Sequence, residues 1–128
     1  MIERCKWKDI NGGAYEQGIR TIIYPVKDKD KARQLFSELL GVKPYVDSPY
    51  YVGFMIGDQE IGLDPNGHEQ GLTGPVGYYH VDDIQKSLQI LQDAGGKVQQ
   101  ELRDVGGGKL VAIAKDTDGN MIGFIQMP

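Results

Sequence analysis

The sequence predicts an α+β protein in which two tandem β-α-β-β-β units form a cupped, eight-stranded mixed sheet around a cavity. Three observations predict this fold. A strand-like run followed by an amphipathic helical pattern occurs twice, the two copies superimpose without gaps, and short strand-like runs with turn residues between them follow each helix. A pattern that repeats at a fixed shift indicates an internal duplication, so both halves are expected to share one order of elements.

The first copy begins with a β-branched run from Thr21 to Val26. Asp28 follows where a helix N-cap accepts backbone N–H bonds, and Gly41 stands where a left-handed C-terminal residue is needed. Between them, apolar residues recur at the three-and-four spacing of one helix face, which we expect to be buried. These residues are Ala32, Leu35, Phe36, Leu39 and Leu40.

The second copy has a strand over Val76 to Val81, a cap at Asp83 and a helix that stops at Gly95-Gly96. A shift of 55 residues places Asp28 on Asp83 and Gly41 on Gly96. The apolar face of its helix consists of Ile84, Leu88 and Leu91. The strand-like runs are YYVGFMIGD and QEIGLDPN after the first helix, and KLVAIAKD and NMIGFIQM after the second.

The 128 residues are expected to form one domain, because a chain of this length buries one core but not two independent ones. Residues 1–17 form an N-terminal extension, residues 18–65 the first unit, residues 66–74 a linker rich in Gly, Pro and Asn, and residues 75–128 the second unit. Trp7 indicates that the extension packs against another part of the protein.

The composition excludes several classes of protein. The net charge is −4 with no basic tract, so nucleic acid is not an expected partner. No stretch approaches the roughly 20 apolar residues that span a bilayer, and the charged N-terminus lacks the apolar centre of a secretory signal. We therefore expect a cytoplasmic protein with no membrane partner. Cys5 is the only cysteine, which excludes an intramolecular disulfide and a thiolate zinc site.

Alternation along the strands divides their side chains between two faces. If Ile22, Tyr24 and Val26 face the first helix, Thr21 faces away from it. In the run that begins at Tyr50, every second residue is bulky, and we assign this set to the helix side. It consists of Tyr50, Val52, Phe54 and Ile56. The residues assigned to the opposite face, as candidate ligand-binding residues, are Thr21, Tyr51, Met55, Tyr78 and His80. A mostly apolar face with a few polar groups is typical of a ligand cavity.

Each candidate also has a structural interpretation. His80 is the candidate for acid–base chemistry, but a single histidine on a strand is as readily a hydrogen-bonded structural residue. Tyr51 and Tyr78 could serve in packing with satisfied hydroxyls. Asp64 precedes Pro65 in a turn, where Asp commonly binds its own backbone, and His68 lies in the linker. The VGGGK run lacks the Ser or Thr and the following helix of a phosphate loop, which predicts a hairpin loop instead.

Three ordered motifs carry a family resemblance. They are the strand reaching V-x-D before a capped helix that ends in LLG, its repeat HVDDIQKSLQILQDAGG, and the closing DTDGNMIGFIQ. Together they resemble the vicinal oxygen chelate superfamily, which includes glyoxalase I, bleomycin-resistance proteins and extradiol dioxygenases. The resemblance covers residues 18–128 and implies the tandem β-α-β-β-β fold.

Metal-dependent members of that superfamily hold one divalent ion with a His or Gln near the start of the first strand of each unit and a Glu or His in its last strand. The corresponding positions in this chain are Thr21, Gly62, Val76 and Gly123. Valine and glycine have no ligating side chain, and a threonine hydroxyl alone is a poor ligand. We therefore expect neither a metal nor another cofactor.

Two functions follow from the resemblance. The first is a metal-free module that binds or sequesters a small organic molecule in an aromatic-lined cavity, as the resistance proteins do. The alternative is a lyase, isomerase or dioxygenase-type enzyme that uses acid–base chemistry through His80 and Tyr78, or a displaced metal site around His80, Glu60 and Asp64. The shortage of titratable partners favours binding. The resemblance and the edges of the small sheets also predict a homodimer.

Overall fold

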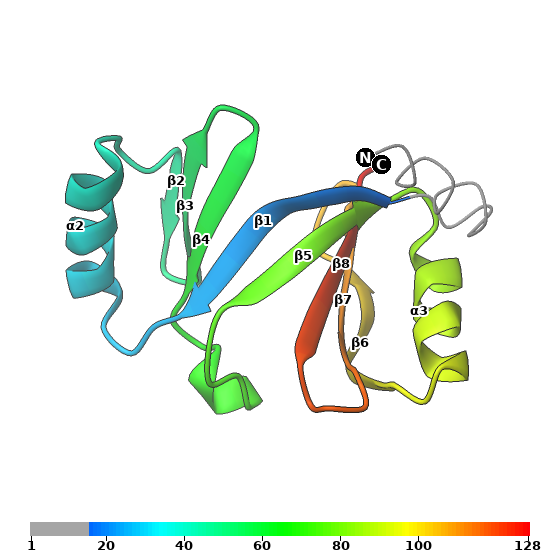
Figure 1. Cartoon of the computed structure of the whole chain (residues 1–128). Coiled ribbons are helices and arrows are strands. Elements are labelled where there is room, and N and C mark those ends of the chain that lie inside the picture. The colour runs from blue at the N-terminus through cyan, green and yellow to red at the C-terminus, as the bar shows by residue number, and fades with distance from the viewer. Residues whose placement is uncertain (1–15) are drawn as a thin grey trace, which may run out of the picture. The chain divides into compact units, whose positions relative to one another are not determined.

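The computed structural model describes residues 16–128, which form eight strands in parallel and antiparallel pairs and two α-helices (Figure 1). The predicted α+β class is confirmed. The first compact unit comprises Arg20–Gly77, and the second comprises Tyr78–Pro128 with the beginning of the first strand. Trp7 lies outside the described residues, as does nearly all of the predicted extension. Neither α-helix in the described part is long and apolar enough to cross a membrane.

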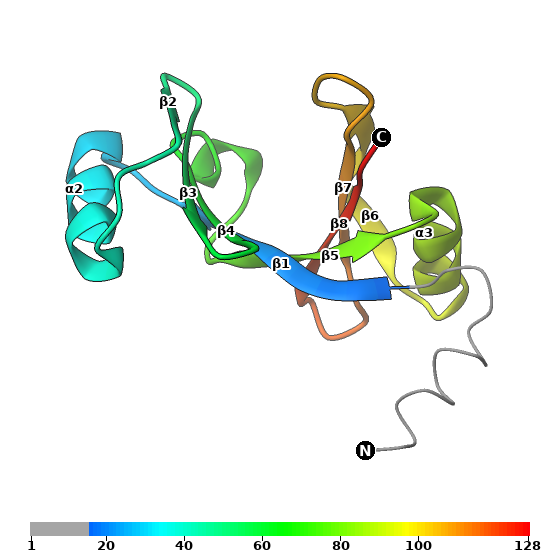
Figure 2. The same cartoon turned by 90° about the horizontal axis from the view of Figure 1, so that it is seen from above.

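The first unit follows the predicted order of elements (Figure 2). Its strands form one half of the eight-stranded mixed sheet, in the order β2-β3-β4-β1, in which β1 pairs parallel with β4 and the other pairs are antiparallel. Part of the predicted linker forms a short 3-10 helix, η1. The bounds are β1 Glu16–Pro25, α2 Lys29–Leu40, β2 Val46–Ser48, β3 Tyr51–Ile56, β4 Gln59–Asp64 and η1 His68–Gln70.

Both predicted ends of α2 are confirmed. The Asp28 carboxylate accepts a bond from the backbone N–H of Lys31 at 3.1 Å, and Gly41 has the left-handed φ of 71° that ends the helix. Ala32, Phe36 and Leu40 of α2 pack against a core formed by Val52, Phe54 and Leu63 of the sheet. This packing fixes which sheet face is free for a ligand.

The prediction that the whole apolar set of α2 is buried is wrong. Leu35 is 58% exposed and Leu39 is 69% exposed. The partly buried residues Ala32, Phe36 and Leu40, which contact the core, are spaced by four. Leu35 and Leu39 each precede one of them and lie about 100° around the helix from it. Tyr50 and Ile56 are likewise exposed, because Tyr50 lies in the turn before β3 and Ile56 is the last residue of β3, both beyond the core.

The second unit repeats the arrangement. Its strands form the other half of the eight-stranded sheet, in the order β5-β8-β7-β6, with β5 parallel to β8 and the remaining pairs antiparallel. The Asp83 carboxylate caps α3 by accepting a bond from the backbone N–H of Lys86 at 3.1 Å, as predicted. The bounds are β5 Val76–Val81, α3 Ile84–Asp93, β6 Lys97–Asp104, β7 Leu110–Lys115 and β8 Met121–Gln126.

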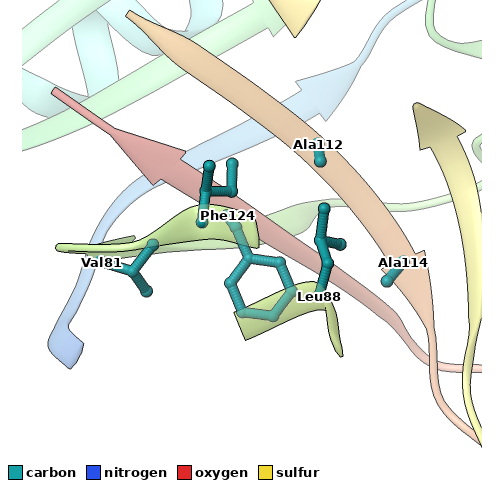
Figure 3. Close-up of a cluster of buried hydrophobic side chains, with 6 residues drawn as sticks. Val81, Leu88, Ala112, Ala114 and Phe124 are labelled. Carbon is teal, nitrogen blue, oxygen red and sulfur yellow. The ribbon is translucent and has the colours of Figure 1, made fainter. Parts of the chain in front are cut away.

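The core of the second unit lies between α3 and its sheet (Figure 3). It consists of Val81, Ile84, Leu88, Ala112, Ala114 and Phe124, with Leu91 packed against it. Burial of the α3 face is therefore confirmed for Ile84 and Leu88, and Leu91 is partly buried. The VGGGK run connects β6 to β7 as a hairpin loop, in which Gly106, Gly107 and Gly108 all have positive φ. This confirms the hairpin and excludes a phosphate-binding strand-to-helix loop.

Candidate functional site

In the first unit, the candidate site lies on the face of the strands that is turned away from α2. Pairing between strands places residues on this face side by side: Thr21 of β1 lies opposite Glu60 of β4, and Glu60 lies opposite Met55 of β3. Directly paired residues point to the same side of a sheet. The predicted assignment of Thr21, Tyr51 and Met55 to the side away from the helix is therefore consistent with the pairing, because Val52 and Phe54 point into the helix-packed core.

Glu60 is the one charged side chain among the buried residues that the structure describes, and it is 9% exposed. Its Oε2 accepts hydrogen bonds from the hydroxyls of Tyr51, at 2.7 Å, and Tyr45. Its Oε1 accepts a longer contact of 3.5 Å from the Thr21 hydroxyl. We call these four residues the Glu60 cluster. Three neutral hydroxyls thus converge on one carboxylate.

Two glycines make the cluster sterically feasible. Gly53 of β3 and Gly62 of β4 are paired on neighbouring strands. A methyl group at Gly53 would lie 2.7 Å from Cε1 of Tyr45, and one at Gly62 would lie 2.6 Å from Cε1 of Tyr51. Both distances are shorter than real carbon contacts, so the tyrosine rings occupy the space that side chains at these positions would fill. The glycine pair therefore lets two tyrosines lie close to the backbone and reach Glu60.

Tyr45 was not among the residues predicted from the sequence. It is 56% exposed overall, but its hydroxyl turns toward Glu60. Burial of that hydroxyl, followed by the hydrogen bond to Glu60 and the negative charge of Glu60, raises the pKa of Tyr45 above its ordinary value. Tyr45 therefore remains protonated through the physiological range and acts as a donor. It lies in the connection between α2 and β2, whose path the sequence does not predict.

The other two predicted site residues, Tyr78 and His80, lie on β5 in the second unit. Their neighbours Tyr79 and Val81 belong to the core beside α3, so Tyr78 and His80 occupy the face turned away from that helix, as predicted. Tyr78 is buried, with 7% of its surface exposed, and pairs with Gly123 of β8. A methyl group at Gly123 would lie 2.5 to 2.8 Å from three carbons of the Tyr78 ring.

The remaining sequence candidates have structural roles or exposed positions. The Asp64 carboxylate accepts a bond from the backbone N–H of Asn66 at 2.8 Å, and this turn is the structural role that its sequence context allowed. His68 begins η1 and is exposed.

The second unit also contains a pocket of about 380 Å³ between α3 and its sheet. None of the predicted site residues lines it. Its lining residues are Tyr79, Ser87, Ile90, Leu91, Ala94, Gly96, Asp116, Thr117, Ile122 and Phe124. Because these residues lie on the helix side of the strands of the second unit, the pocket is separate from the face that carries Tyr78.

Comparison with known proteins gives a consistent family. The family model of the Glyoxalase/Bleomycin resistance protein/Dioxygenase superfamily matches residues 18–124. A probable lactoylglutathione lyase of Vibrio parahaemolyticus serotype O3:K6 (strain RIMD 2210633) is 31% identical over 118 residues, covering 79% of this chain and 84% of that protein.

Solved structures agree on the fold. Methylmalonyl-CoA epimerase from Mycobacterium tuberculosis is 15% identical with a TM-score of 0.66, covering 90% of this chain and 91% of that one. A glyoxalase/bleomycin resistance protein/dioxygenase superfamily member from Vibrio splendidus 12B01 is 15% identical with a TM-score of 0.65, covering 84% of this chain and 97% of that one. At these identities the likeness concerns the fold alone.

Proposed function

The chain belongs to the Glyoxalase/Bleomycin resistance protein/Dioxygenase superfamily, and from this premise we propose that it binds a small organic molecule without the help of a metal. The proposal is carried by one observation: tyrosine rings fill the space at two positions where metal-dependent relatives have metal-ligating side chains. At both last-strand positions where metal-dependent relatives carry a Glu or His, this chain has a glycine covered by a tyrosine ring: Gly62 by Tyr51, and Gly123 by Tyr78.

The residues present do not fit the metal of the family. Gly62 and Gly123 have no donor atoms, and the rings above them leave no room for a longer side chain. Val76 is an apolar residue with 1% exposure, and the Thr21 hydroxyl contacts Glu60. A divalent ion needs several oxygen, nitrogen or sulfur ligands at once. The proposed function therefore involves no metal.

The lyase activity in the name of the Vibrio parahaemolyticus relative is not carried over to this chain. In this superfamily such chemistry uses the metal positions that Thr21, Gly62, Val76 and Gly123 occupy here. The displaced metal site around His80, Glu60 and Asp64 also lacks support, because the Asp64 carboxylate caps a turn and Oε2 of Glu60 accepts two tyrosine hydroxyls. Metal-free acid–base chemistry by His80 remains an untested prediction.

We expect the purified, untagged protein to retain well below one metal ion per chain. The test equilibrates it with zinc, nickel and manganese, dialyses it, and measures the metals by elemental analysis. In parallel, mass spectrometry of the native protein and of its denatured extract tests for a bound organic molecule.

Two results would overturn the proposal. Stoichiometric metal retention that is lost in His80→Ala would establish a metal site and favour the enzyme. The absence of any organic ligand, both in the native spectrum and after screening a broad metabolite panel by thermal shift, would contradict the binding function.

We also propose that the protein is a homodimer. Within the described strands, β2 pairs only with β3 and β6 only with β7, so each leaves one edge with unpaired backbone groups. Light scattering over a dilution series is expected to give a dimer mass at tens of micromolar protein. A monomer mass at every concentration of the series would contradict this proposal.

A further inference from the structure

Glu60 has an unusual environment for a buried carboxylate. Its hydrogen-bond partners within residues 16–128, which are Thr21, Tyr45 and Tyr51, all donate from neutral hydroxyls. No Lys, Arg or His within the unit Arg20–Gly77 forms a salt bridge with it. Removing a carboxylate from water is costly unless it is hydrogen-bonded and paired with a cation. Among the residues that the structure describes, Glu60 has hydrogen-bond donors but no cationic partner.

The two carboxylate oxygens are used unequally. Within the described part of the chain, Oε2 accepts two hydroxyls, one of them at 2.7 Å, whereas Oε1 has only the 3.5 Å contact with Thr21. Each carboxylate oxygen has two lone-pair directions, so Oε2 is saturated and Oε1 retains the capacity for a short, charge-assisted bond. The tyrosine pair therefore fixes the carboxyl group in one orientation and leaves one oxygen for another donor.

The surroundings of Glu60 indicate what kind of donor fits. Met55, which pairs with Glu60 from the neighbouring strand β3, is 42% exposed, and Tyr45 is 56% exposed. The carboxylate therefore lies next to apolar and aromatic surface that is open to solvent. No group of three His, Cys, Asp or Glu side chains in the described part of the chain is placed to hold a metal ion. An organic cation needs only one carboxylate, and its apolar body can lie on an aromatic ring.

We propose that Glu60 anchors the ammonium or guanidinium group of an organic ligand through Oε1, with Tyr45, Tyr51 and Met55 contacting the ligand's apolar body. This inference rests on the proposed small-molecule binding and adds the chemical class of the ligand. The carboxylate provides the selectivity for charge. The two tyrosines hold it in place before the ligand arrives, so that binding does not have to order it.

The test uses three probes of similar size and different charge with the full chain at pH 7: 2-phenylethylamine, 2-phenylethanol and 3-phenylpropanoate. Isothermal titration calorimetry is expected to give saturable binding of the amine, at least about tenfold tighter than that of the alcohol, because a hydrogen bond to a charged group is worth more than a neutral one. The carboxylate probe is expected not to bind, because it meets a buried charge of its own sign.

Glu60→Gln separates recognition of the cation from a purely structural role. The glutamine carbonyl can still accept both tyrosine hydroxyls, so the melting temperature is expected to stay near that of the parent protein. Binding of the amine is expected to fall about tenfold or more, to the level of the alcohol, while binding of the alcohol is unchanged. Glu38→Gln, on the exposed side of α2, is the matched control and is expected to change neither.

Equal binding of amine and alcohol by the parent protein would overturn the inference and leave the proposed binding function intact, and this comparison needs no variant. Undiminished amine binding by Glu60→Gln would do the same. Failure of all three probes would also overturn it, whereas the proposed function is judged separately by the search for a copurified or screened ligand.

Discussion

Phe54→Ala is expected to lower the free energy of unfolding by about 3–5 kcal/mol, which is the usual cost of removing a large aromatic side chain from a core. Phe54 has no exposed surface, and its ring lies 6.4 Å from that of Phe36 on α2. Truncation removes apolar burial and leaves a cavity where α2 meets the sheet. A small domain is stable by only about 5–15 kcal/mol, so this one change removes a large part of the total.

Leu39→Ala is the matched control, because it also truncates an apolar residue of the first unit. Leu39 is 69% exposed, so its removal is expected to change stability by no more than about 0.5 kcal/mol. Urea unfolding followed by circular dichroism measures both variants. A loss of several kcal/mol in Leu39→Ala would mean that this helix surface is covered in solution, and a small loss in Phe54→Ala would contradict the assignment of the core.

Gly123→Ala is the second substitution with a large expected effect, and it tests the basis of the metal-free proposal. The added methyl group would lie 2.5 to 2.8 Å from the Tyr78 ring. Because Tyr78 is 7% exposed, its ring has little space into which it could move. Overpacking of this kind costs about 1–3 kcal/mol, and the same clash excludes the longer carboxylate side chain that a metal would need at this position.

A double-mutant cycle identifies Tyr78 as the cause. Tyr78→Ala is itself costly, but once the ring is gone the Gly123→Ala change is expected to have little further effect, which gives a coupling energy of about 0.5–3 kcal/mol. Gly74→Ala is the control, because a methyl group there meets nothing within 4 Å. Additive effects in the cycle would contradict the interpretation that the Tyr78 ring fills the space of the metal-ligating side chain that metal-dependent relatives carry at the position of Gly123.

Some features of α2 and α3 could be predicted from the sequence and others could not. The caps at Asp28 and Asp83 were predictable, because a cap depends on bonds to the backbone three residues away. The burial of Leu35 and Leu39 was predicted wrongly. Spacing defines an apolar arc on a helix, but the width of the neighbouring sheet decides how much of that arc is covered, and this width is a property of the assembled unit.

The candidate site shows the same division. Strand alternation placed Thr21, Tyr51 and Met55 on one face and Tyr78 and His80 on the corresponding face of the repeat, because the period of a strand is fixed by its backbone. It did not identify the convergence of Tyr45 and Tyr51 on Glu60. A glutamate inside the short strand run QEIGLD, two residues before Gly62 and therefore on the same face of the strand, was a signal for such a contact, but its partners come from three separate segments.

The amino-acid sequence by itself determined the duplication, the order of the elements, the helix caps and the face of each strand, because each of these depends on neighbours within a few residues or on a repeated pattern. Only the tertiary structure decided which apolar helix residues are covered, which tyrosine ring lies on Gly62 and which on Gly123, and where the hydroxyl of Tyr45 points. These features depend on contacts between distant segments, whose distances arise only when the strands pair and the helices pack.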